Sequence, residues 1–145
     1  MSRTQVYKSK LPAGIYEISG SVIYFPDKLL LVNISACNLK RIQLRGTMGN
    51  LLLYFLLNSR SGFVSDEELM TEVWEKNELR ASSHRLWQVT RDLSFKLAEA
   101  GLREELYTRN RKRKGYTINN DIVTSVNSRN HDVFKNDVIK ASYVQ

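Results

Sequence analysis

The stretch from Ser82 to Tyr116 constrains the fold most, because it combines one amphipathic helix with a basic hairpin. At about 100° per residue, one side of this helix forms the apolar stripe that a core requires, made of Leu86, Val89, Thr90, Leu93 and Leu97. The opposite side carries His84, Trp87, Gln88, Arg91 and Phe95. Arg and Gln can form paired hydrogen bonds with base edges, so this outward face indicates a helix that enters a major groove.

A run of four cations, Arg111 to Lys114, stands directly before Gly115 and Tyr116. Gly115 is expected to supply the permissive backbone of a tight turn, and the residues after it have strand character. A solvated loop is the alternative reading of such a run. Because strand signals flank it, we interpret residues 109–116 as a wing whose cations contact phosphates or the minor groove: Arg109, Arg111, Lys112, Arg113 and Lys114.

The net charge of +7 is concentrated in the same part of the chain. Between Arg80 and Tyr116 there are ten Lys and Arg residues against four Asp and Glu residues, a net charge of +6. Clustered positive charge favours a polyanionic partner, since neutralising phosphates releases their counterions. Double-stranded DNA is therefore the expected partner.

The segments before the helices predict a small antiparallel sheet. Strand character appears at residues 15–18, 21–25, 28–33 and 40–44, separated by turn residues. Its covered face would carry Val22, Tyr24, Leu29 and Leu31. Residues 1–14 are expected to be a flexible lead-in, and Cys37 a half-buried residue in a connection. Residues 119–145 are expected to be a flexible tail with one short helix through Val133, Phe134 and Val138.

Three helices are predicted between the sheet and the hairpin. The first runs from an N-cap at Thr47 to about Ser59 and is apolar nearly all round, which indicates a central core helix. The second begins with a capping box of Ser65 and Glu68 and continues through Leu69, Val73 and Trp74. The third spans about 82–98, is capped by Ser82 or Ser83, and stops near Gly101. The fold class is α+β, a winged helix-turn-helix with an N-terminal antiparallel sheet and a C-terminal β-hairpin wing.

Residues 15–118 resemble the OmpR/PhoB-type winged-helix DNA-binding domain of bacterial transcription regulators. The pattern around the second helix is Val64–Ser65–Asp66–Glu67–Glu68–Leu69 followed by Val73–Trp74. The third helix carries Leu86, Val89/Thr90, Leu93 and Leu97 at the family's core spacing, and the wing closes with Gly115–Tyr116–Thr117–Ile118. The basic residues before Gly–Tyr are most similar to the ToxR/CadC-like branch.

This resemblance implies a transcriptional regulator that binds double-stranded DNA. A cytoplasmic location is expected separately, because the single cysteine fits a reducing compartment and the N-terminus lacks the apolar run of a signal peptide. The third helix would read bases through His84, Arg85, Trp87, Gln88 and Arg91. Lys76 and Arg80 lie in the loop where the family touches either the DNA backbone or RNA polymerase. Because the family commonly binds repeated half-sites, a homodimer on DNA is a further expectation. The resemblance gives no role for Phe95, which stands where the family often has a basic residue.

Other classes of function have less support in the sequence. No catalytic, metal or cofactor site is predicted, because His84, His131 and Cys37 lack ligand spacing and no phosphate loop occurs. Trp87 could pack against the wing or the sheet instead of meeting DNA. A winged-helix module that regulates through a protein partner is the main alternative, and an RNA-binding protein is a weaker one. No stretch is long and apolar enough to be expected to cross a membrane.

Overall fold

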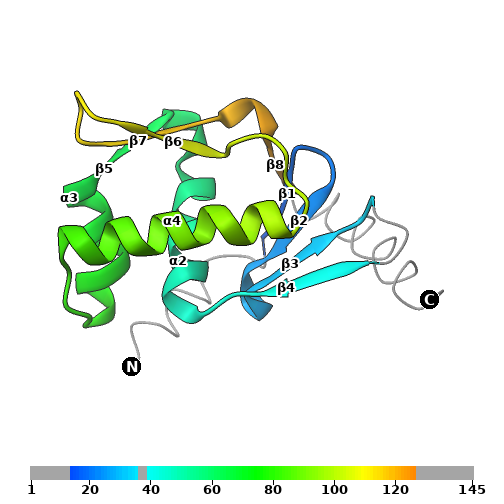
Figure 1. The fold of residues 1–145 in the computed structure, drawn as a ribbon, viewed down its shortest axis with the longest axis horizontal. Coiled ribbons are helices and arrows are strands. Elements are labelled where there is room, and N and C mark those ends of the chain that lie inside the picture. The colour runs from blue at the N-terminus through cyan, green and yellow to red at the C-terminus, as the bar shows by residue number, and fades with distance from the viewer. Residues whose placement is uncertain (1–13, 36–38, 127–145) are drawn as a thin grey trace.

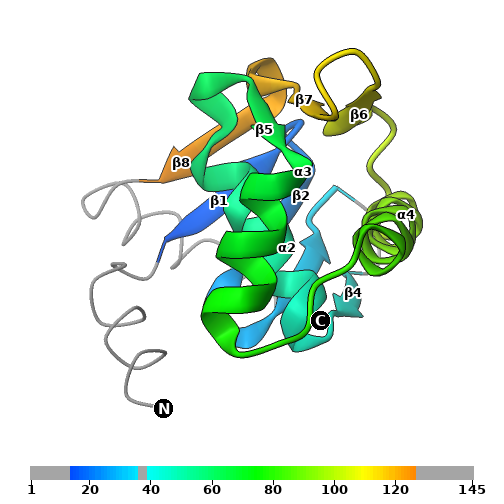
Figure 2. The same cartoon turned by 90° about the vertical axis from the view of Figure 1, so that its left-hand side faces the viewer.

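Three helices lie between two antiparallel sheets in this computed structural model, which describes residues 14–35 and 39–126. In Figure 1 the five-stranded sheet occupies one end of the molecule, and a β-hairpin runs above the long helix α4 (Ser83–Glu99). Figure 2, turned by 90°, shows α4 nearly end-on, at the outside of the molecule. One side of α4 therefore packs on the core while the other side faces outward.

The larger sheet has the strand order β4-β3-β2-β1-β8. Its strands are β1 (Ile15–Ile18), β2 (Val22–Phe25), β3 (Leu30–Asn33), β4 (Lys40–Gln43) and β8 (Val123–Val126). Partners in register place Tyr16, Tyr24 and Leu31 in one row, so these side chains share a face. That face is buried in the core, which confirms Val22, Tyr24 and Leu31 as covered residues, whereas Leu29 precedes β3 and is only partly buried.

The helices follow the predicted order with two differences at their ends. Helix α2 spans Gly46–Leu57 and is buried over most of its surface. The prediction of Thr47 as its N-cap is wrong: Arg45 holds that position without a side-chain cap, and Thr47 lies inside the helix. Helix α3 is short, Asp66–Leu69, and continues as a π-helical turn η3 (Met70–Trp74) and a 3₁₀ turn η4 (Glu75–Asn77).

The second helix begins with the capping box that the sequence predicts. Ser65 Oγ accepts a hydrogen bond of 3.0 Å from the backbone N–H of Glu68. The side chain of Glu68 accepts in return from the backbone N–H of Ser65. Leu69, Val73 and Trp74 then face the core, each no more than 2% exposed. The helix start and its buried side are both confirmed, although the regular α-helical geometry ends at Leu69.

The second sheet has the order β5-β7-β6 and contains the hairpin. Strands β6 (Tyr107–Asn110) and β7 (Gly115–Ile118) are joined by a turn at residues 111–114, and we call this hairpin the wing. Strand β5 (Phe63–Ser65) pairs with β7 and leads directly into α3. The wing is thereby attached to the start of the second helix.

The expectation of a flexible tail from residue 119 is wrong for its first residues. Asn120–Ile122 form a 3₁₀ turn, and β8 pairs antiparallel with β1 from Ile18↔Val123 to Ile15↔Val126. Ile122 is buried in the core. The expected short helix at residues 133–138, the lead-in at residues 1–13 and Cys37 lie outside the described residues.

Candidate nucleic-acid interface

Helix α4 presents the predicted outward face. Ser82 is the N-cap, and its Oγ accepts a 3.1 Å hydrogen bond from the backbone N–H of Arg85. Leu86, Thr90, Leu93 and Leu97 are buried. The side chains proposed to read bases all lie on the exposed side of the helix: His84, Arg85, Trp87, Gln88 and Arg91.

Trp87 is held by residues of its own helix. Its ring stacks with that of His84, with centroids 6.2 Å apart, and the guanidinium of Arg91 lies 4.6 Å from its centroid on the next turn. Such a cation–π contact contributes about 0.5–1 kcal/mol at an exposed site. Trp87 is still 50% exposed, so it is not buried against the wing or the sheet. The trio His84, Trp87 and Arg91 forms an ordered ridge on the face of α4.

Thr90 connects this helix to the wing. Its Oγ1 donates to the Trp87 carbonyl at 2.9 Å and lies 3.0 Å from the hydroxyl of Tyr116 on β7. The hydroxyl of Tyr107 on β6 donates to the backbone carbonyl of Thr90. Burial raises the pKa of the Tyr107 hydroxyl well above its ordinary value, so this donor stays protonated. Both strands of the wing are thus fixed against one residue of α4.

Aromatic packing supports the same junction. Phe55 of α2 stacks on Tyr107 with centroids 4.4 Å apart and meets the edge of Tyr116 at 5.9 Å. The rings of Tyr107 and Tyr116 are perpendicular, with 5.7 Å between their centroids. Such pairs contribute about 0.5–1.5 kcal/mol beyond their buried area. The orientation of the wing relative to α4 is therefore determined by the core.

Gly115 has a different role from the one that its sequence context predicts. The residue with a positive φ in this turn is Lys114, at 52°. A Cβ atom on Gly115 would lie 2.2 Å from the Val64 carbonyl oxygen and 2.5 Å from the Phe63 ring. Gly115 is therefore required because β7 approaches β5 closely, and not because of its backbone conformation.

Arg109 has a protein partner, although the sequence places it among the DNA contacts. Its guanidinium forms a bidentate pair with Asp66, with N–O distances of 2.6 and 2.9 Å. It also lies 5.0 Å from the centroid of the Tyr116 ring. The Asp66 carboxylate raises the pKa of the guanidinium further. Because these contacts hold the side chain between β6 and the start of α3, its charge is already balanced within the protein.

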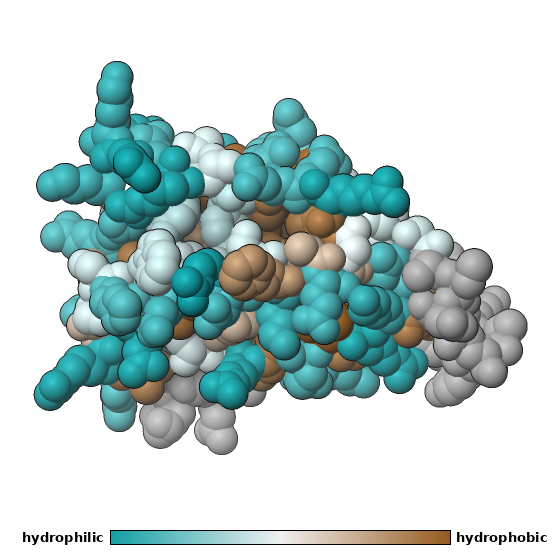
Figure 3. Space-filling view, in the orientation of Figure 1, coloured by the Kyte–Doolittle hydropathy of each residue, from teal (hydrophilic) through white to brown (hydrophobic). Residues whose placement is uncertain are grey.

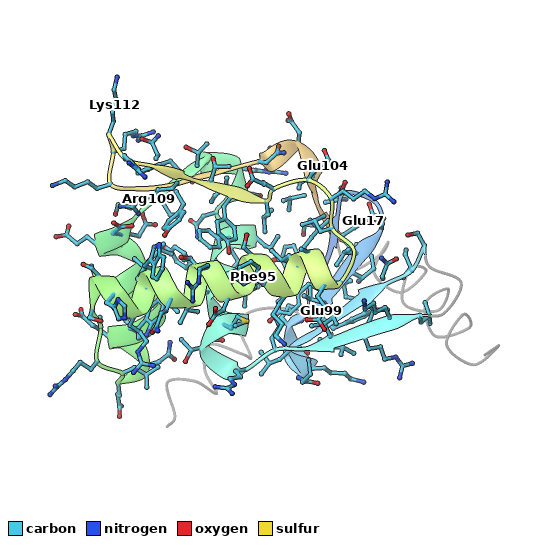
Figure 4. The ribbon with its side chains drawn as sticks, viewed as in Figure 1. Glu17, Phe95, Glu99, Glu104, Arg109 and Lys112 are labelled. Carbon is cyan, nitrogen blue, oxygen red and sulfur yellow. The ribbon has the colours of Figure 1, made fainter. Side chains whose placement is uncertain are left out.

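The other wing cations extend from the turn. Arg111, Lys112, Arg113 and Lys114 are all exposed. The guanidinium of Arg113 lies 3.8 Å from the centroid of the Phe63 ring, which orders it along β5. Lys112 is at the tip of the hairpin, pointing away from the molecule in Figure 4. The wing thus presents four exposed cations, of which Arg113 rests on an aromatic ring.

Lys76 and Arg80, the two candidate residues before α4, differ in their contacts. Lys76 on η4 forms an ion pair of 2.9 Å with Glu72 one turn earlier. Arg80 is exposed in the segment that leads into α4. Both remain candidates for backbone contacts at the N-terminal end of α4.

A groove runs between α4 and the wing, and its charge changes along its length. Arg91, Arg109 and Arg111 line it toward the wing tip, whereas Glu104 and Glu105 line it toward the other end. Figure 3 shows hydrophilic groups crowding the wing end and apolar side chains at the middle of this face. In Figure 4 Lys112 and Arg109 lie at one end, and Glu99, Glu104 and Glu17 lie toward the other. The wing end is therefore the more cationic end of the groove, and the other end has mixed charge because Arg103 lines it beside Glu104 and Glu105.

Several residues of this region were missed at the level of sequence. Asp66 and Phe63, which hold Arg109 and Arg113, are more than forty residues away from them in the chain. Arg103 also lines the groove. Asp92 lies next to Arg91 on α4, with an N–O distance of 3.8 Å. A local pattern could have shown Asp92, but the pairs that span the fold leave no local signal.

Within residues 14–35 and 39–126, no three His, Cys, Asp or Glu side chains gather closely enough to hold a metal ion. In the same part of the chain, no helix combines the length and apolar character needed to span a bilayer.

Comparison with known structures decides the fold. No model of a protein family and no curated protein sequence matches the chain. The structure is similar to that of the DNA-binding domain of E. coli CadC, with a TM-score of 0.60 and 18% sequence identity. The likeness covers 72% of this chain and 91% of that domain. The protein has a winged helix-turn-helix fold. In this winged helix α2, α3 with η3, and α4 are the three helices, and β6–β7 is the wing.

Proposed function

We propose that this winged-helix protein is a bacterial transcriptional regulator that binds double-stranded DNA. Helix α4 enters the major groove, and the wing contacts the phosphate backbone or the minor groove. One observation carries the proposal. Trp87 and Arg91 on the exposed ridge of α4 line the same groove as Arg111 of the wing, so one ligand can contact both elements. The fold also agrees, since its structural neighbour is described as a DNA-binding domain.

We assign the roles from the position of each side chain on α4 or the wing. In this assignment Gln88 and Arg91 hydrogen-bond base edges, and His84, Arg85 and Trp87 lie near the start of α4. Arg111, Lys112, Arg113 and Lys114 supply phosphate contacts, which contribute affinity more than sequence choice. Arg109 acts mainly within the protein, because Asp66 neutralises it. RNA polymerase at the η4–α4 loop and a homodimer on repeated half-sites are additional partners in this proposal.

The test is selection of duplexes from a random library, followed by titration at several salt concentrations. The wild-type protein should prefer one selected sequence. Arg91→Ala should remove about 1–3 kcal/mol of discrimination at one position, whereas R111A/K112A should weaken all sequences and reduce the salt slope by about 2. Lys112 and Arg111 are suitable because they are exposed turn residues.

A matched control loses the same charge elsewhere. K28A/K40A removes two exposed cations from the sheet end of the molecule and should leave the salt slope near that of the wild type. If the control weakens binding as much as R111A/K112A, the net charge and not the wing drives association. If no duplex is selected even at low salt, the proposal fails, and the alternative of a module that binds a protein partner takes its place.

A further inference from the structure

Phe95 is the most exposed large apolar side chain in the described part of the protein, at 64%. It stands two turns after Trp87 and one turn after Arg91, on the same side of α4. In Figure 4 it projects from the middle of the helix, and it lines the groove below the wing. A single exposed apolar residue is common on protein surfaces, but this one lies inside the proposed interface.

The charges around Phe95 argue against a phosphate as its neighbour. Arg91 precedes it by one turn, but Glu99 follows it by one turn. The adjacent cation, Lys96, lies 3.8 Å from a carboxylate oxygen of Glu99. Phe95 therefore stands between the arginines of the wing end and a segment of mixed charge that contains Glu99, Arg103, Glu104 and Glu105. An apolar contact with a base is the interaction that this position offers.

Base pairs present one apolar group in the major groove, the 5-methyl of thymine. We propose that Phe95 contacts the 5-methyl group of a thymine, so that the DNA site requires thymine at that position. The inference rests on the proposed function. It adds Phe95, for which the sequence indicates no role, to the residues that recognise bases. Trp87 is less suited to this contact, because Arg91 covers one face of its ring.

The location of this thymine relative to the base read by Arg91 follows from geometry. Four residues of helix advance about 6 Å, which corresponds to about two base pairs along the DNA axis. The methyl contact is therefore expected within about two base pairs of the position whose preference Arg91→Ala abolishes. A separation of this size is expected only if Arg91 and Phe95 contact the same major groove from the same helix.

Replacement of single thymines by deoxyuridine in the selected duplex tests the contact, because it removes the methyl group and leaves base pairing intact. At one position the wild-type affinity should fall about three- to fivefold, the loss expected for one buried methyl group. Phe95→Ala should bind the thymine and uracil duplexes equally. Phe95→Leu should keep part of the difference, since it retains an apolar side chain.

Leu57→Ala serves as the control, because Leu57 is another exposed large apolar residue, at 40%, on a different helix. It should keep the wild-type response to deoxyuridine. The inference is overturned if Phe95→Ala remains as sensitive as the wild type, if no thymine is sensitive, or if the sensitive thymine is remote from the Arg91 position. In each of these cases the wild-type preference for the selected duplex still supports the proposed function. If no duplex is selected, both fail together.

Discussion

At the scale of the residue, Thr90 has more structural consequence than its type suggests. A Thr within a helix commonly bonds a carbonyl one turn back, and Thr90 does so with Trp87. The same hydroxyl meets Tyr116, and the carbonyl of Thr90 accepts from Tyr107. One residue therefore joins the exposed ridge of α4 to both strands of the wing.

Thr90→Val should destabilise the protein by about 1–3 kcal/mol, because it leaves the buried Tyr116 hydroxyl without its partner. Chemical denaturation of T90V, Y116F and the double variant measures this coupling. The double variant should be more stable than the sum of the single effects predicts, since both ends of the hydrogen bond are then removed. Strict additivity of the two effects would contradict the contact.

Arg109 shows why the role of a residue cannot be inferred from its neighbours in the sequence alone. Within the run of residues 109–114 it looks like the cations beside it, and the sequence groups it with them. Its carboxylate partner, Asp66, comes from the first turn of α3. The charge of a residue is visible in the sequence, but whether that charge is available to a ligand depends on the fold.

At the scale of the element, the sequence predicts helices whose apolar residues repeat at the helical period. It does not predict strands whose partners are distant in the chain. The buried and exposed sides of α4 were both predicted, because a 17-residue helix gives its period several times. The capping box at Ser65 was predicted from local chemistry. The N-cap of α2 and the π-helical turn η3 were not predicted, because Arg45 uses no capping side chain and η3 continues the pattern of α3. Strand β8 was not predicted either, since it pairs with β1 more than a hundred residues earlier. The sequence predicted which side chains of α4 and the wing are exposed, but for the same reason it did not predict the partners Asp66 and Phe63.

Gly115→Ala tests the close approach of β7 to β5. The added Cβ would clash with the Val64 carbonyl, so the two strands must separate and the wing should lose its fixed orientation. Hydrogen exchange should show faster exchange of the amides of β5 and β7, with α2 and the larger sheet less affected. Equal protection of β5 and β7 in the two proteins would refute this reason for the glycine.

At the scale of the whole molecule, the interface is separated from the elements that stabilise the sheet. The cations of the wing lie at one end of the groove, and β8 joins the sheet at the other end of the fold. Ile122, just before β8, is buried within the same core that carries α2 and α4. Stability and binding should therefore respond to different substitutions.

Ile122→Ala should lower the free energy of unfolding by about 2–4 kcal/mol, through lost burial and the cavity that remains. Its DNA affinity, measured at a temperature where the variant is folded, should match that of the wild type. Thr124→Ala, at an exposed position of β8, is the control and should change stability little. A wild-type stability of Ile122→Ala would show that β8 is not part of the cooperative fold.

The pairing of β1 with β8 also has a consequence for synthesis of the protein on the ribosome. The first strand receives its neighbour on one side early, from β2, but its other side waits for nearly the whole domain to be made. Until Val126 has emerged, one edge of β1 is an open template that another chain can occupy. The edge of β1 is covered only when residues 123–126 have emerged, so it stays open to mispairing while the helices and the wing are being synthesised.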